Sequence, residues 1–233
     1  MSFGQNLQFL RRMRHSMTQE DLAEKMAVSR QTVSKWETGD AYPEMDKALE
    51  LCRIFSCSMD QLIREDMTVS SEAYSNLRIE KAKAFRYVPY AVISRDPEGD
   101  AIAHIKAWAA GQGIRETDII GWDFPHVSQE QVNVFHMHGY AAACVVPEEF
   151  EEAGPGHEVL CQPAVSCAAI TVTEPFRAPF TLIPSAYRAL MSFMQVNGYS
   201  RKCSKDGSFI TCYEKVYRSG ELECMDVFIA VEG

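Results

Sequence analysis

The sequence lacks the features that direct a chain into or across a membrane. Residues 1–10 contain no long apolar run of the kind that a signal peptide needs, and no segment of the 233 residues approaches the roughly twenty apolar residues of a membrane-spanning helix. A chain of this length suits two domains, each able to bury its own core. We therefore expect a cytoplasmic protein with no membrane partner.

The cysteines lack the paired spacing of a zinc site or a redox motif. No C-x-x-C pair occurs among the eight of them, and several lie inside apolar runs. We therefore expect reduced, mostly buried thiols and no disulfide framework. The positions are Cys52, Cys57, Cys144, Cys161, Cys167, Cys203, Cys212 and Cys224.

Motifs for catalysis and for cofactor binding are also missing. There is no Walker loop, no Rossmann glycine pattern, no G-x-S-x-G and no H-E-x-x-H. His136 and His138 fall on one face of a predicted strand and could form half of a metal site, but no Cys, Asp or Glu completes it at ligand spacing. We expect no catalytic residue, no cofactor and no metal.

Positive charge is scarce, and its distribution matters more than its total. The net charge is -9, which taken alone argues against a nucleic-acid partner. Residues 1–66 hold nine Lys and Arg against eleven Asp and Glu, a net charge of -2, so -7 falls in the remainder. Arg11, Arg12 and Arg14 lie close together, and Arg30 and Lys35 follow. A local basic surface is therefore possible.

Helix signals follow one another through the first sixty residues. Apolar residues at steps of three and four, from Phe3 to Met13, predict a helix that ends near His15. Thr18 and Asp21 have the spacing of a capping box and predict a second, short helix that ends near Ala27.

A third predicted helix, Arg30 to Glu37, begins after the N-cap Ser29 and turns Val33 and Trp36 inward. Its outer side chains carry donors and acceptors that fit base edges in a major groove. They are Arg30, Gln31, Ser34 and Lys35.

Two more helices complete the pattern. Gly39 is expected to end the third helix, Pro43 to start a fourth, and Ser58–Ile63 to form a short fifth. The segment from Met17 to Ile63 closely resembles the all-α five-helix domain of Cro and phage-repressor (Xre)-type transcriptional regulators.

The resemblance implies binding to a double-stranded DNA operator, and we expect a homodimer. It implies that Gln19 lies against a phosphate, that the outer residues of the third helix face the bases, and that Arg12 and Glu37 form a partly buried ion pair. Alternatively, each of these residues alone is an ordinary solvated or capping residue of a helical bundle. The predicted DNA-binding residues are Gln19, Ser29, Arg30, Gln31, Thr32, Ser34, Lys35 and Thr38, the last replacing an Asn common in the family.

The second part of the chain contains an internal repeat. Residues 67–79 are rich in small polar residues and predict a linker, so we expect domains at 1–66 and 80–233. Each half of the second domain predicts strand, helix, strand, strand. The matching segments are 91–97 with 169–175, 101–114 with 186–199, 119–124 with 210–215, and 140–146 with 225–231.

Two such halves predict an α+β domain, a curved antiparallel sheet of about six to eight strands with two helices on one face. This arrangement resembles the gyrase-inhibitor-like effector-binding domain found in some AraC-type regulators. The resemblance implies a groove that binds a small, apolar or cationic effector. It leaves open a hydrolase that uses Glu214 as a general base, or a module that binds another protein.

Glu214 is the residue that points most directly to a ligand. Alternation along Phe209–Tyr217 puts it on one face with Ile210, Cys212 and Val216, where a carboxylate needs a proton or a cationic partner. The alternative is an open sheet on which Glu214 is solvated. The predicted effector-binding residues are Glu214, Tyr213, Trp122, Asp123, Phe124, Tyr140 and Tyr187.

Overall fold

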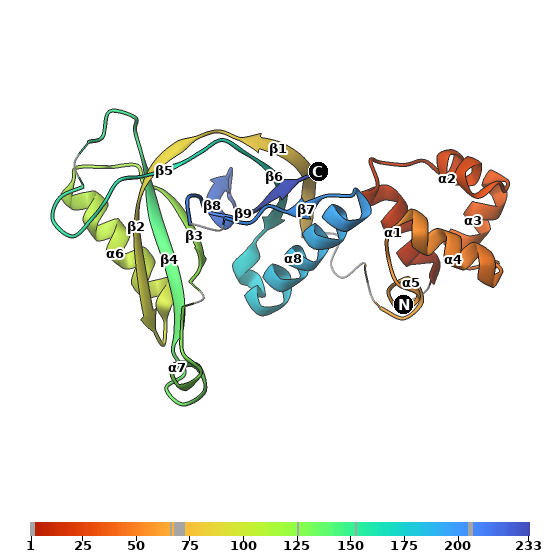
Figure 1. Ribbon diagram of the computed structural model, residues 1–233, viewed down its shortest axis with the longest axis horizontal. Coiled ribbons are helices and arrows are strands. Elements are labelled where there is room, and N and C mark those ends of the chain that lie inside the picture. Colours follow the sequence, from red (N-terminus) through yellow and green to blue (C-terminus); the bar gives the residue numbers. More distant parts are fainter. Residues whose placement is uncertain (1–2, 66, 68–72, 125, 152, 205–206) are drawn as a thin grey trace. The chain divides into compact units, whose positions relative to one another are not determined.

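The computed structural model describes residues 3–65, 67, 73–124, 126–151, 153–204 and 207–233 (Figure 1). Contacts between residues divide the chain into two compact units. The first comprises Met1–Leu77, Pro175–Ser200 and Glu232–Gly233, and the second Arg78–Glu174 and Arg201–Val231. Residues 68–72 of the predicted linker lie outside the described residues, and the expected domain limits remain predictions.

The first unit begins with five helices, as the sequence predicts. They are α1 (Phe3–Met13), α2 (Gln19–Met26), α3 (Arg30–Thr38), α4 (Met45–Ile54) and α5 (Met59–Ile63). The capping box between Thr18 and Asp21 is present, and so is a second one between Ser58 and Gln61. The expected start of the fourth helix at Pro43 is wrong, because Glu44 keeps an extended backbone as the N-cap.

A further helix belongs to the first unit. This helix, α8 (Pro179–Val196), follows a short 3-10 turn at Pro175–Arg177. Its last residue, Val196, is buried in the same apolar cluster as Leu7 and Leu10 of α1. Beyond it, the amide of Asn197 donates to the carbonyl of Met13 at 3.0 Å. The core of the helical unit therefore includes the end of α8.

A nine-stranded sheet, most of it in the second unit, runs in the order β1-β6-β9-β8-β3-β4-β2-β5, with β7 paired to β9. The strand pairs are antiparallel: β2 pairs with β4 and with β5, β3 pairs with β4 and with β8, and β9 pairs with β6 and with β8. The strands are β1 (Tyr74–Ala82), β2 (Phe85–Ser94), β3 (Asp118–Asp123), β4 (His138–Val146), β5 (Leu160–Gln162), β6 (Val165–Thr173), β7 (Ser200–Arg201), β8 (Cys212–Ser219) and β9 (Leu222–Glu232). β1 begins inside the segment predicted as linker.

The predicted duplication is confirmed. The first half runs β2, α6 (Pro97–Gly111), β3, β4, and the second half runs β6, α8, β8, β9. A short helix, α7 (Gln129–Asn133), is inserted between β3 and β4. Strands β1, β5 and β7 lie outside the repeat and make the sheet larger than the expected six to eight strands.

Each face of the sheet carries its own apolar layer. α6 packs against β2 and β4 (Figure 1), and Val88, Ile105 and Ala142 belong to the layer on this side. Their neighbours Tyr87 and Ala143 belong to the layer on the opposite side, as the two-residue alternation of a strand requires. We call the first side the α6 face and the second the aromatic face.

The cysteines are less buried than the sequence suggested. All eight are free, as expected, but only Cys144, Cys167 and Cys224 are buried, so the expectation of mostly buried thiols is wrong. Cys161 is exposed because it lies on β5, the last strand of the sheet, next to the inward-facing Gln162.

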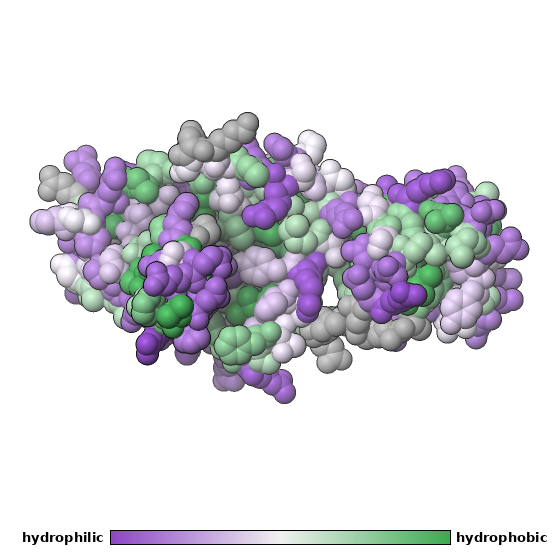
Figure 2. Space-filling view, turned by 60° about the horizontal axis from the view of Figure 1, so that its bottom comes forward, coloured by the Kyte–Doolittle hydropathy of each residue, from purple (hydrophilic) through white to green (hydrophobic). Residues whose placement is uncertain are grey.

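The outer surface is mixed in character. Figure 2 shows hydrophobic residues in small groups among hydrophilic ones on the face in view. Among the described residues, no helix has both the length and the apolar character needed to cross a membrane.

Candidate nucleic-acid interface and effector site

Helix α3 has one buried side and one exposed side. Val33 and Trp36 are buried, which confirms the predicted inward positions, and Glu37 is buried beside them. Arg30, Gln31 and Lys35 are exposed and Ser34 is partly exposed. The three- and four-residue steps of the helix therefore separate a packing side from a polar outer side.

Both ends of α3 are fixed by local hydrogen bonds. Ser29 is the N-cap, and its hydroxyl accepts from the backbone N–H of Thr32 at 3.1 Å. At the other end Gly39 adopts a left-handed conformation with φ of 82°. The Thr38 hydroxyl lies 2.6 Å from a carboxylate oxygen of Asp40 and 3.1 Å from the carbonyl of Ser34. Ser29, Thr32 and Thr38 thus have structural roles at the ends of the helix.

The buried partner of Glu37 is Arg11, so the expectation of a pair with Arg12 is wrong. Arg11 Nε lies 2.6 Å from Glu37 Oε1, and Nη2 lies 3.0 Å from Oε2. Arg11 follows Leu7 by four residues and therefore shares its inward face, whereas Arg12 is exposed. The Gln19 amide donates to Glu37 Oε2 at 2.9 Å and joins α2 to the same network.

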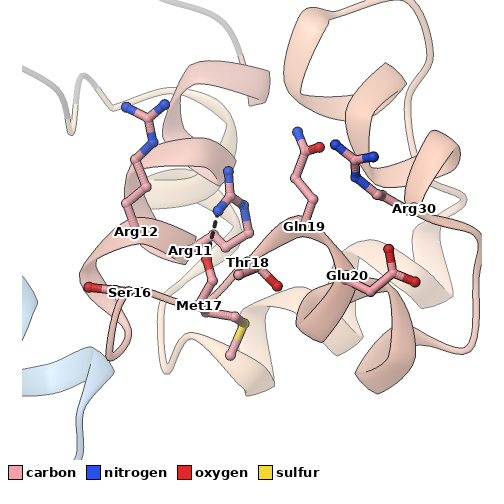
Figure 3. Close-up of a pocket in the computed structure, with 8 residues that line it drawn as sticks. All are labelled: Arg11, Arg12, Ser16, Met17, Thr18, Gln19, Glu20 and Arg30. Carbon is pink, nitrogen blue, oxygen red and sulfur yellow. Dashed lines mark hydrogen bonds between the residues drawn. The ribbon is translucent and has the colours of Figure 1, made fainter.

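A surface pocket opens where the first three helices meet. It has a volume of about 510 Å³, and Figure 3 shows the side chains of Arg12, Gln19 and Arg30, one from each helix, projecting to the same side. The first turn of α2 lies at the pocket, and the N-terminal end of a helix favours anions. The lining residues are Arg11, Arg12, Ser16, Met17, Thr18, Gln19, Glu20 and Arg30.

In the second unit, Tyr140 and Glu214 lie on the α6 face. Gly121 of β3 pairs with Glu214 of β8, so the two residues point to the same side of the sheet. A Cβ built on Gly121 would lie 2.1 Å from the Tyr140 hydroxyl oxygen, which means that the tyrosine ring covers this glycine. Asp123, two residues after Gly121, pairs with Tyr140.

Carboxylates gather around Tyr140. Burial raises the pKa of its phenol, and the charges of Glu214, Glu98 and Asp123 raise it further. Burial also raises the pKa of Glu98, with smaller contributions from Asp96 and Asp123. The α6 face therefore holds a phenol close to several acidic groups, an arrangement that favours a cation.

The other predicted effector residues lie elsewhere. Tyr213 is buried on the aromatic face, where its ring stacks on Phe228 at 4.8 Å between centroids. Trp122 belongs to the same face. Phe124 follows β3, and its N–H donates to the carbonyl of Gly139. Tyr187 is on α8 in the first unit. The structure thus brings together Glu214, Asp123 and Tyr140, and it adds Glu98, which the sequence did not single out.

The predicted alternation fails at Ile210, which packs on the aromatic face with Tyr213 and not on the side of Glu214. The strand begins only at Cys212. Upstream of it the buried side chain of Gln162 accepts from the N–H of Ile210 at 2.8 Å and donates to its carbonyl at 3.1 Å. The amide side chain of Gln162 therefore takes the place of a neighbouring strand for the backbone of Ile210. The alternation of side chains along β8 consequently does not extend back to Ile210.

Comparisons with known proteins agree on the first part of the chain. A helix-turn-helix family model matches residues 8–62. The HTH-type transcriptional activator BcrR of Enterococcus faecalis is 36% identical over 91 residues, which cover 38% of this chain and 42% of BcrR. An uncharacterized HTH-type transcriptional regulator of Bacillus subtilis, YgzD, is 41% identical over 51 residues, which cover 22% of this chain and 77% of YgzD. The chain thus matches less than half the length of BcrR.

The crystal structure of the EcmrR C-terminal domain matches 67% of this chain and 97% of its own length, with 12% sequence identity and a TM-score of 0.48.

Proposed function

Because the chain belongs to the helix-turn-helix transcriptional regulators, we propose that it binds operator DNA through α3 and responds to a small cationic molecule. The observation that carries the first half is the polar outer side of α3. Gln31, Ser34 and Lys35 offer donors and acceptors for base edges in the major groove. In this proposal the DNA site is an inverted repeat bound by a homodimer.

Phosphate contacts are assigned to the pocket at the start of α2. Arg12 and Arg30 are exposed cations on its wall, and the Gln19 amide lines the same pocket. These contacts fix the register of the domain on the duplex, whereas α3 supplies the sequence preference.

Salt dependence tests the phosphate contacts. Replacing Arg12 by Ala should weaken binding to all DNA sequences alike and reduce the slope of log K against log salt by about one unit. Arg53→Ala removes an exposed charge from α4 and should leave the slope unchanged. An unchanged slope in Arg12→Ala would remove this residue from the interface.

The effector is assigned to the acidic cluster on the α6 face. Three carboxylates near one phenol repel one another, and a lipophilic cation relieves that repulsion while its apolar part covers the ring. The test titrates tetraphenylphosphonium and the uncharged triphenylphosphine oxide into the full chain. We expect saturable binding of the cation alone, weakened in Glu214→Gln and unchanged in Glu221→Gln, which alters an exposed residue of the β8–β9 turn.

Coupling between the two functions requires that the effector prefers one of two states of the chain that differ in DNA affinity.

A hydrolase that uses Glu214 is the competing function. It requires a substrate to be consumed, so recovery of a bound ligand unchanged after prolonged incubation excludes catalysis on that ligand. Product formation that disappears in Glu214→Gln would replace the sensor proposal.

A further inference from the structure

Two histidines far apart in the sequence meet beside α6. His104 lies on α6 and His157 on the segment before β5, and their Nε2 atoms are 3.2 Å apart across 53 residues of sequence. Both side chains are partly exposed. The pair lies outside the acidic cluster and has no part in the function proposed above.

Aromatic neighbours hold both imidazoles in place. The ring of Tyr90 stacks on His104 at 3.6 Å between centroids, with an angle of 12° between the planes. The ring of Trp108 stacks on His157 with 5.6 Å between the centroids. The indole N–H of Trp108 donates to the carbonyl of Ala153. The two rings therefore meet in a packed and oriented arrangement.

The tautomer of His157 follows from its backbone contact. Its Nδ1 lies 3.3 Å from the carbonyl of Pro155, which can only accept a hydrogen bond. Nδ1 consequently carries the proton, and Nε2 presents a lone pair toward His104. A ring N–H that donates to a carbonyl is also the usual way in which proteins orient a metal-binding imidazole.

The distance between the two nitrogens fits a metal ion. Bonds of about 2.0–2.1 Å in a tetrahedral arrangement place two ligating nitrogens roughly 3.3–3.4 Å apart. The observed 3.2 Å is close to this value. The alternative is a direct hydrogen bond between the rings, for which His104 would carry its proton on Nε2.

Space for further ligands is present next to His157. An open pocket of about 610 Å³ is lined by this histidine and by Glu151 and Glu158. Arg86 also lines it, but its guanidinium donates to the carbonyl of Glu148. Among the described residues no third His, Cys, Asp or Glu completes a metal cluster, so water must fill the remaining positions.

We propose that His104 and His157 bind a divalent transition-metal ion, of the class that imidazole favours, such as Ni²⁺ or Zn²⁺. Water completes the coordination from the pocket. The bound ion joins α6 to the segment that precedes β5. It would thereby stiffen the helix that covers the first half of the sheet.

Calorimetric titration of the tag-free full chain with Ni²⁺, and separately with Zn²⁺, tests the site. We expect one saturable ion per chain, with affinity at least about tenfold lower in His104→Gln and in His157→Gln. The matched control is the double variant His126→Gln and His138→Gln, which removes two exposed imidazoles and should bind as the parent does. No saturable binding, or equal affinity in all variants, would overturn the proposal.

Tryptophan fluorescence locates the ion independently of the histidine variants. Bound Ni²⁺ next to His157 should quench Trp108, one of three tryptophans in the chain. Trp108→Phe should abolish this quenching and retain calorimetric binding. Quenching that persists in Trp108→Phe would place the ion elsewhere and contradict the site.

Discussion

Glu37 of α3 accepts hydrogen bonds from Nε and Nη2 of Arg11 on α1, at 2.6 and 3.0 Å. The side chain of Glu37 is 2% exposed and that of Arg11 is 9% exposed, so water has little access to the pair. The third nitrogen of the same guanidinium, Nη1, donates to the carbonyl of Met17 at 2.6 Å. One arginine thus joins α1, the following turn and α3.

Removing either member of this pair should leave a buried charge without its partner. We expect Arg11→Ala and Glu37→Ala each to lower the free energy of unfolding by about 3–5 kcal/mol, measured by urea denaturation. Arg12→Ala is the matched control, because Arg12 is exposed, and should change stability by less than about 0.5 kcal/mol. Equal losses in Arg11→Ala and Arg12→Ala would contradict the assignment.

Gly121 should tolerate no side chain. A Cβ there would lie 2.1 Å from the hydroxyl oxygen and 2.7 Å from the Cζ of Tyr140. Gly121→Ala should therefore destabilise the protein by about 1–3 kcal/mol in thermal or urea unfolding. Gly111→Ala serves for comparison, because a Cβ at Gly111 meets nothing within 4 Å. If both substitutions were neutral, Tyr140 would not cover β3.

The thiols should react at very different rates. Burial, followed by the neighbouring Cys52, raises the pKa of Cys57 to about 12. Only the thiolate reacts, so alkylation of Cys57 at pH 8 should be far slower than that of the exposed Cys161 and Cys203. Mass spectrometry of peptides after timed iodoacetamide treatment measures the order, and early labelling of Cys57 would show that its surroundings are open.

The acidic cluster should make stability depend on pH. Because the folded state raises the pKa of Glu98, it holds this proton more tightly than the unfolded chain does. Ionising Glu98 therefore lowers stability as the pH rises above its usual value of 4.5. Glu98→Gln should raise the Tm at pH 7, and this gain should disappear as the pH falls below 4.5. A gain that grows on acidification would contradict the predicted direction.

Local signals in the sequence were sufficient to predict most of the helices and strands. Caps and apolar steps predicted α2 and α3, because a capping box and a helical period involve only residues three or four apart. The repeat predicted the two strand-helix-strand-strand halves, since duplicated segments keep their pattern wherever they pack.

Two features that the sequence did not predict depend on long-range contacts. Gln162 replaces the strand partner of Ile210 across 48 residues, and His104 meets His157 across 53. No periodicity links such positions, so their partners become known only from the fold. The burial of Arg11 could have been predicted from the sequence, because Arg11 follows the inward-facing Leu7 by four residues and so lies on the same face of α1.

The most direct test of the central claim measures binding of the full chain to DNA from its own promoter by fluorescence anisotropy. The triple variant Arg30→Ala, Gln31→Ala and Lys35→Ala should lose at least about a hundredfold in affinity, since it removes two base contacts of roughly 1–3 kcal/mol each and the phosphate contact of Arg30. Arg53→Ala should bind within about threefold of the parent, because a substitution outside the interface changes the free energy of binding by less than about 0.7 kcal/mol. Equal affinity of the triple variant and the parent would contradict the assignment of α3 as the DNA-reading helix.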